Sequence, residues 1–260
     1  MPAKKGFAQT FAQRVVKMIN LVYNYRIRSI YTMIFGGLQK LTLLDFPNHM
    51  ACIVFTQGCN LRCPFCHNSA LVCHNDDLIS QNEVISYLQK RKGVLDGVCI
   101  SGGEPLHQKD IVEFITMVKN MGYKVKLDTN GTNYEKLAYL VENNLVDYVA
   151  MYIKNSKELY EVTCGCDVDL DEVSKCVDLL KQGKVDYEFR TTVCRPLHDQ
   201  HSIKLVAEWL KDAKHWYIQQ FEDSGSLLGE GVSAFDKDAM QALHAVAVSI
   251  CPTAELRGVK

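Results

Sequence analysis

Short apolar runs alternate with helical patterns along most of the chain, and this alternation constrains the fold more than any other feature. Runs rich in β-branched or apolar residues occur at 51–56, 97–101, 124–128, 147–153, 186–192 and 215–221. Helical periodicity lies between them, over 109–121, 134–142, 171–182, 203–212 and 237–248. A further helix is expected to begin at Ser80, because Glu83 completes a capping box. Six strand–helix units in series predict a parallel sheet covered by helices, either open or closed into a barrel.

The composition is that of a globular protein and excludes several classes. The chain has 260 residues, 47% of them hydrophobic, and a net charge of -1, which suits one large domain or two small ones and gives no bulk reason to expect nucleic acid. No uncharged apolar run reaches the roughly 18 residues of a transmembrane helix. The 11 cysteines form an odd number, without a secretory signal pattern. We therefore expect reduced thiols in the cytoplasm, where close clusters of cysteine more often bind metal.

The first 32 residues differ from the rest. Residues 1–44 carry seven basic side chains and no acidic one. Apolar side chains at helical spacing predict a basic amphipathic helix that contacts a membrane surface or an acidic partner; they are Phe7, Phe11, Val15, Met18 and Val22. The same composition also fits an organelle presequence, or extra translated sequence upstream of a start at Met33. We accordingly divide the chain into a basic extension, 1–32, and a domain, 33–260.

Three cysteines follow the first strand within eight residues, as Cys59, Cys63 and Cys66. Gly58 and Pro64 favour a loop here, so three thiolates can surround one metal centre. A structural zinc site normally takes four ligands in two separated pairs, and no second pair follows. An iron–sulfur cluster with one open iron suits a catalytic site. Spacing alone favours iron–sulfur over zinc, with reduced structural thiols as a third reading.

Polar and charged residues also follow the later strands, where ligands bind in parallel α/β folds. The sequence Gly102-Gly103-Glu104 combines close backbone approach with a carboxylate suited to an ammonium group, although such a turn is often only a tight connection. Asp128 could accept hydrogen bonds from ribose, whereas Asn130-Gly131 is typical of a turn. Lys154 and Arg190 could each hold a carboxylate or lie at a solvated strand end.

Together these motifs resemble the radical S-adenosylmethionine (radical SAM) superfamily, in the order Cys-x-x-x-Cys-x-Phe-Cys and then Gly-Gly-Glu-Pro. The finer resemblance is to activating enzymes of glycyl-radical proteins, and within them to activators of anaerobic ribonucleoside-triphosphate reductase. It covers residues 33–260 and is carried by the segments 36–40, 44–47, 66–68, 127–131, 146–151, 187–192 and 219–221.

The resemblance implies a six-stranded parallel partial TIM barrel that is open on one side. It implies that Cys59, Cys63 and Cys66 hold a [4Fe–4S] cluster whose fourth iron is chelated by the amino and carboxylate groups of S-adenosylmethionine. The remaining cofactor contacts that it implies are Gly102, Gly103 and Glu104 for the amino group, Phe65 and His67 beside the adenosine, Asp128 near the ribose with Asn130 in the same motif, and Lys154 and Arg190 for the carboxylate. No side chain is expected to act as a catalytic acid, base or nucleophile.

The implied reaction is the activation of a partner enzyme. The reduced cluster cleaves S-adenosylmethionine, and the 5′-deoxyadenosyl radical takes hydrogen from a glycine of the partner, expected to be anaerobic ribonucleotide reductase. A one-electron donor such as flavodoxin or ferredoxin is also implied. Two alternatives remain open: another radical SAM reaction, such as peptide modification or deazapurine synthesis, or a non-catalytic, metal-stapled α/β binding protein.

Two features depart from the family pattern. Tyr152 stands where the family usually has an aspartate that helps to bind the cofactor's amino group or a nearby cation. Cys164, Cys166 and Cys176 could ligate an auxiliary cluster, although we favour ordinary thiols because cysteine is commonly buried as a small hydrophobe.

Overall fold

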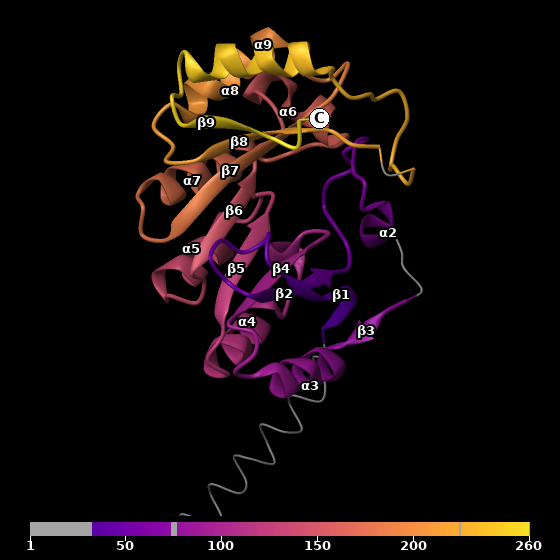
Figure 1. Cartoon of the computed structure of the whole chain (residues 1–260), viewed down its shortest axis with the longest axis vertical. Helices are drawn as coiled ribbons and strands as arrows, with labels where there is room; N and C mark the ends of the chain where they lie inside the picture. Colours follow the sequence, from indigo (N-terminus) through magenta and orange to yellow (C-terminus); the bar gives the residue numbers. More distant parts are fainter. Residues whose placement is uncertain (1–32, 74–76, 224, 260) are drawn as a thin grey trace, which may run out of the picture. The chain divides into compact units, whose positions relative to one another are not determined.

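The computed structural model describes residues 33–73, 77–223 and 225–259, so the expectations for residues 1–32 lie outside the described part. Within it, the strands form one sheet of nine in the order β3-β1-β2-β4-β5-β6-β7-β8-β9 (Figure 1). The strands are β1 (Ile34–Thr42), β2 (Ala51–Thr56), β3 (Ile79–Ser80), β4 (Gly97–Gly102), β5 (Lys124–Thr129), β6 (Tyr148–Tyr152), β7 (Asp186–Val193), β8 (Trp216–Gln220) and β9 (Ala254–Arg257).

Parallel pairing runs without interruption from β2 through β4 to β9, whereas β1 pairs antiparallel with both β2 and β3. All six predicted strands are present, and the α/β class with a mainly parallel sheet is confirmed. The sheet nevertheless continues past them, with β9 beside β8 at one edge and with β1 beside β2, followed by β3 beside β1, at the other. Periodicity missed these three strands because β9 and β3 are very short and β1 contains Gly36 and Gly37.

The helices follow the strand order, from α3 near β1 and β3 to α9 beside α8 (Figure 1). They are α2 (Ser69–Val72), α3 (Gln81–Arg91), α4 (Ile111–Asn120), α5 (Tyr134–Glu142), α6 (Tyr160–Cys164), α7 (Leu170–Lys181), α8 (Gln200–Leu210) and α9 (Lys237–Val248). The predicted capping box at the start of α3 is confirmed, since Ser80 and Glu83 exchange their hydrogen bonds. The short helix α6 has no counterpart among the predicted helices.

The core forms where amphipathic helices cover the sheet. The predicted apolar face of α4 is fully buried, and the ring of Phe114 contacts that of Phe35 on β1 with centroids 4.8 Å apart. On β8, the buried indole of Trp216 donates a hydrogen bond of 3.0 Å to the Thr191 hydroxyl, so its one polar atom is satisfied. No helix in the described residues has the length and apolar character needed to cross a membrane.

Parallel register brings the carboxyl ends of distant strands to one edge of the sheet. Thr56 pairs with Gly102, Thr129 with Met151, and Tyr152 with Arg190. The loops that follow β2, β4, β5 and β6 therefore meet at this edge, which is where parallel α/β proteins bind their ligands.

Candidate functional site

The loop between β2 and α2 carries Cys59, Cys63 and Cys66, and hydrogen bonds fix its path on two sides. Gly58 adopts φ +91, a left-handed conformation that turns the chain away from β2, and its N–H donates to the Leu71 carbonyl at 2.7 Å. Farther along the loop, the Gly229 N–H donates to the Pro64 carbonyl at 2.9 Å. We call residues 58–66 the cysteine loop.

The turn after β4 packs directly against the cysteine loop. The Gly103 N–H donates to the Thr56 carbonyl at 3.0 Å, and the Glu104 N–H donates to the Gly58 carbonyl at 2.8 Å. A Cβ at Gly103 would lie 2.0 Å from the Gly58 oxygen, so only glycine permits this approach. The glycine pair is therefore more than a tight connection between two elements. It packs the end of β4 against the cysteine loop and places Glu104 in the wall beside that loop.

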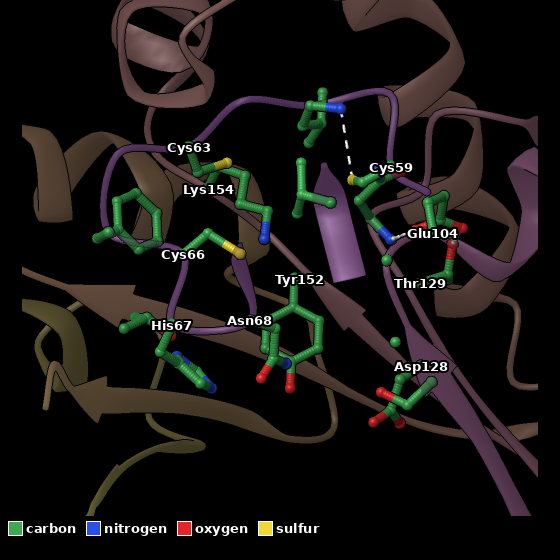
Figure 2. Close-up of a pocket in the computed structure, with 18 residues that line it drawn as sticks. Cys59, Cys63, Cys66, His67, Asn68, Glu104, Asp128, Thr129, Tyr152 and Lys154 are labelled. Atoms are coloured by element: carbon green, nitrogen blue, oxygen red, sulfur yellow. Dashed lines mark hydrogen bonds between the residues drawn. The ribbon is translucent and has the colours of Figure 1, made fainter. Parts of the chain in front are cut away.

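One cavity opens between these loops and the strand ends. In Figure 2, Cys63 and Cys66 lie on one side of the cavity with Lys154 reaching between them, Cys59 lies across from them near Glu104, and Asp128 lies farther along the wall, beyond Thr129. The thiols, the Lys154 ammonium and the Asp128 carboxylate therefore all line one cavity.

The three thiols have different electrostatic surroundings. Burial raises the pKa of Cys59 to about 11 and also raises that of Cys66. The pKa of Cys63 is instead lowered to about 6, because the Cys164 thiol donates a hydrogen bond to its sulfur and the Lys154 ammonium lies nearby. Burial acts to lower the pKa of Lys154, but nearby thiolates raise it, so Lys154 stays protonated among the cysteines.

Glu104 is a buried carboxylate held by donors from two elements. One oxygen accepts from the Thr129 hydroxyl at 2.7 Å and from the Leu106 N–H at 3.0 Å, and the other accepts from the Asn130 N–H at 2.7 Å. Burial raises the pKa of Glu104 above its ordinary value, although these hydrogen bonds act in the opposite direction. Two carboxylate oxygens have about four acceptor positions, so capacity remains for a ligand ammonium.

Asp128 lines the cavity from β5 and is backed by two buried cations. Lys126, itself fully buried, forms an ion pair with one oxygen, and the Arg190 guanidinium lies 3.9 Å from the other. Burial opposes ionisation, but both cations lower the pKa of Asp128 below its ordinary value. Asp128 is therefore an ionised hydrogen-bond acceptor.

Arg190 is the one predicted site residue that does not line the cavity. It pairs with the buried Glu188 on its own strand and donates a hydrogen bond of 3.0 Å to the Tyr152 hydroxyl. Its guanidinium is thus held by protein groups in the sheet. The other predicted residues all line the cavity, namely Cys59, Cys63, Phe65, Cys66, His67, Gly102, Gly103, Glu104, Asp128, Asn130 and Lys154.

Sequence reasoning left out six further residues of the cavity wall: Leu61, Asn68, Val72, Ser101, Thr129 and Thr192. Tyr152, which the sequence singled out as a departure from the family pattern, lines the cavity too. Several of them carried a usable signal. Thr129, Tyr152 and Thr192 lie at the carboxyl ends of β5, β6 and β7, the position that marks ligand contacts in this class of fold.

The donor set fits an iron–sulfur cofactor better than a single metal ion. Thiolates are soft ligands that favour zinc or iron–sulfur clusters. Across residues 33–73, 77–223 and 225–259, no three His, Cys, Asp or Glu side chains converge tightly enough to hold one ion. Three thiols spread around one cavity, next to a cation and a carboxylate, instead suit a cluster with an organic ligand beside it.

Fold and site together define an α/β protein in which three thiols, a cation and a buried carboxylate line one cavity at the carboxyl edge of a parallel sheet. The sequence matches the radical SAM superfamily over residues 53–212, and the chain belongs to that superfamily. The family implies an iron–sulfur cluster and S-adenosylmethionine.

Individual relatives agree with this assignment. The chain is 34% identical to "Putative glycyl-radical enzyme activating enzyme MJ1227" of Methanocaldococcus jannaschii, over 72% of this chain and 79% of that protein. It is 37% identical to the pyruvate formate-lyase-activating enzyme of Listeria monocytogenes, over 39% of this chain and 46% of that one. The crystal structure of Streptococcus suis SuiB bound to precursor peptide SuiA has a similar fold, with a TM-score of 0.62 and 15% identity over 79% of this chain and 48% of that chain.

Proposed function

We propose that this protein is a glycyl-radical enzyme activating enzyme and that its partner is an anaerobic ribonucleoside-triphosphate reductase. The observation that carries the proposal is the single cavity that gathers Cys59, Cys63, Cys66, Glu104 and Lys154. The relatives' names indicate the class of reaction, and the resemblance of the sequence motifs indicates the partner. We also propose that the protein acts in the cytoplasm, with a flavodoxin or ferredoxin as electron donor.

In this proposal the three cysteines of the loop bind a [4Fe–4S] cluster and leave one iron for S-adenosylmethionine. When bound, these groups supply a one-electron cleavage that gives a 5′-deoxyadenosyl radical, which removes hydrogen from a glycine of the partner. The chain's own residues bind and orient. Glu104 accepts from the cofactor's ammonium, Lys154 attracts its carboxylate, and Asp128 accepts from the ribose.

The remaining assignments follow from position along the cavity wall. Gly102 and Gly103 present backbone to the ammonium end, Phe65 and His67 lie beside the adenosine, and Asn130 ties the wall together through its hydrogen bond of 2.9 Å to Asn60 in the cysteine loop. Arg190 acts on the carboxylate end at a distance, because it already pairs with Glu188 and Tyr152.

We also propose that the six strands β2 and β4 to β8 form a partial barrel, within a domain that spans residues 33–260. In this proposal residues 1–32 are a basic stretch of the sequence outside that domain. The antiparallel β1 and the parallel β9 widen the sheet on its two sides.

The test uses the full chain, loaded anaerobically with iron and sulfide and then mixed with reductant, S-adenosylmethionine and a purified glycyl-radical enzyme. We expect a glycyl-radical electron paramagnetic resonance (EPR) signal on anaerobic ribonucleotide reductase and none on pyruvate formate-lyase. A signal on pyruvate formate-lyase alone would overturn the choice of partner. Formation of 5′-deoxyadenosine without a glycyl radical on either enzyme would overturn activation and favour peptide modification or deazapurine synthesis.

A further inference from the structure

A turn far downstream of the cysteine loop packs against it. This turn, Cys164-Gly165-Cys166, ends helix α6, and its contacts reach the middle of the loop. The Arg62 N–H donates to the Cys164 carbonyl at 2.8 Å, and the Cys166 thiol donates to the Asn60 carbonyl at 3.6 Å. The backbone between Cys59 and Cys63 is therefore held by a second element that contributes no residue to the wall of the cavity.

Gly165 makes this close packing possible in two ways. It adopts φ +66, the left-handed conformation that ends α6. A Cβ added to it would lie 2.5 Å from the Arg62 carbonyl oxygen, so any larger residue would push the loop away from the helix end.

The Cys164 side chain points from this turn to one of the three loop cysteines. It is fully buried, and its thiol lies close enough to the sulfur of Cys63 for the two groups to interact. A buried thiol that contacts a predicted cluster ligand differs from the other buried cysteines. Cys176 on α7, for example, is equally buried and makes no contact with the cysteine loop among the interactions given for it.

We propose that Cys164 and Gly165 are positioning residues of the cluster site: the backbone of the turn sets the path of the loop, and the Cys164 thiol donates to Cys63 while Cys63 ligates iron. The inference rests on the proposed function and adds to it a partner outside the three-cysteine motif. Hydrogen bonds to ligand sulfur stabilise the more electron-rich, reduced form of an iron–sulfur cluster. Cys164 thus makes the cluster easier to reduce, which is the step on which reductive cleavage depends.

The first experiment compares Cys164→Ala, Cys164→Ser and the matched control Cys176→Ala, each as the full chain loaded anaerobically. Iron content and the EPR-monitored reduction potential are measured without S-adenosylmethionine. We expect every variant to retain its iron. The potential should become more negative in Cys164→Ala, remain nearer the wild-type value in Cys164→Ser, whose hydroxyl can still donate, and stay unchanged in Cys176→Ala.

Two results would overturn this inference. A potential in Cys164→Ala equal to that of the wild type and of Cys176→Ala would show that the thiol does not act on the cluster. Loss of iron from a folded Cys164→Ala would instead make Cys164 a ligand. If the wild-type chain itself binds no cluster, the proposed function fails, so the two failures are distinguishable.

The second experiment tests the backbone contact with Gly165→Ala and the control Gly183→Ala. Gly183 has a similar φ of +71 after α7, but an added Cβ there would meet only the flexible end of Lys214, at 3.2 Å. Both variants carry the same left-handed strain, and Gly165→Ala adds the clash with the Arg62 carbonyl, so circular dichroism should report a loss of thermal stability in both and a larger one in Gly165→Ala. We expect iron content to fall only in Gly165→Ala, and equal iron content in the two variants would contradict the role of the turn.

Discussion

Tyr152 distinguishes this site from the pattern of the family, which usually has aspartate at the corresponding position. Its ring lines the cavity, the Lys154 ammonium lies 4.9 Å from the ring centroid, and its hydroxyl accepts from Arg190. A neutral ring thus contacts both cations that the resemblance assigns to the cofactor's carboxylate. The cavity wall therefore has a phenol at this position instead of a carboxylate, and Arg190 is held by Tyr152 and Glu188 within the sheet.

Replacing Tyr152 with Asp should therefore tighten the binding of S-adenosylmethionine to the loaded protein. A charged hydrogen bond to the ammonium group contributes about 1.5 kcal/mol, which corresponds to roughly tenfold in Kd. Equilibrium dialysis of the cluster-loaded chain measures the effect. Tyr152→Phe is the matched control, since it retains the ring and removes only the hydroxyl that accepts from Arg190; a Kd that is unchanged in Tyr152→Asp would show that no family contact has been lost.

The residues of the site differ in how far sequence could predict them. The cysteines and the glycine pair lie in short motifs that directly follow predicted strands. Their positions in the sequence were therefore sufficient to predict that they line one cavity. The surroundings of Arg190 depend on Glu188 and Tyr152, and those of Cys63 depend on Cys164. Glu188 lies two residues from Arg190 on β7, but Tyr152 and Cys164 come from β6 and α6, so spacing within a motif carries no information about these two partners.

At the scale of elements, the turn after β4 is the joint between sheet and cysteine loop. Gly103→Ala should displace the loop, because the new Cβ would lie 2.0 Å from the Gly58 oxygen and neither backbone can yield easily. We expect the variant to bind clearly less iron than the wild type under the same loading conditions. Gly37→Ala on β1 is the control, since its Cβ would make an ordinary contact of 3.4 Å with Phe55. Equal iron content in both variants would show that the turn after β4 does not hold the cysteine loop in place.

Asp147 joins three elements at the opposite end of the strands. It accepts from Lys119 at 2.7 Å, from Lys124 at 2.9 Å and from the Val125 N–H at 2.8 Å, which links the start of β6 to α4 and β5. Burial by itself raises the pKa of Asp147, but these donors outweigh it and hold the pKa below its ordinary value. A carboxylate with a lowered folded-state pKa stabilises the fold above its unfolded-state pKa of about 3.9, and this contribution disappears as the pH falls through the folded-state value.

Asp147→Asn should accordingly reduce the free energy of unfolding by about 1–2 kcal/mol at pH 7. The difference in unfolding free energy between wild type and variant should stay constant down to about pH 5 and narrow below about pH 4. Urea denaturation across this range measures it. Asp178→Asn on the exposed face of α7 is the control and should leave stability unchanged. A difference that does not depend on pH would show that the ion pairs are not its cause.

At the scale of the whole molecule, the alternation of strands and helices was enough to predict the α/β class and the edge of the sheet that carries the site. The width of the sheet was not predictable. Strand β9 has only four residues, and β1 is stabilised by pairing with β2 on one side and β3 on the other rather than by a clear period of its own. Such strands form because a neighbouring strand offers unpaired backbone groups, which single-sequence periodicity does not detect.

The central claim is that the chain cleaves S-adenosylmethionine reductively at a cluster held by the cysteine loop. The most direct measurement is the amount of 5′-deoxyadenosine formed by the anaerobically loaded full chain with reductant, for the wild type, Cys63→Ala and the matched variant Cys251→Ala, which removes a buried cysteine outside the site. We predict product from the wild type and Cys251→Ala, and neither visible cluster absorbance nor product from Cys63→Ala. No product from a fully loaded wild-type chain, or equal product from Cys63→Ala, would contradict this account.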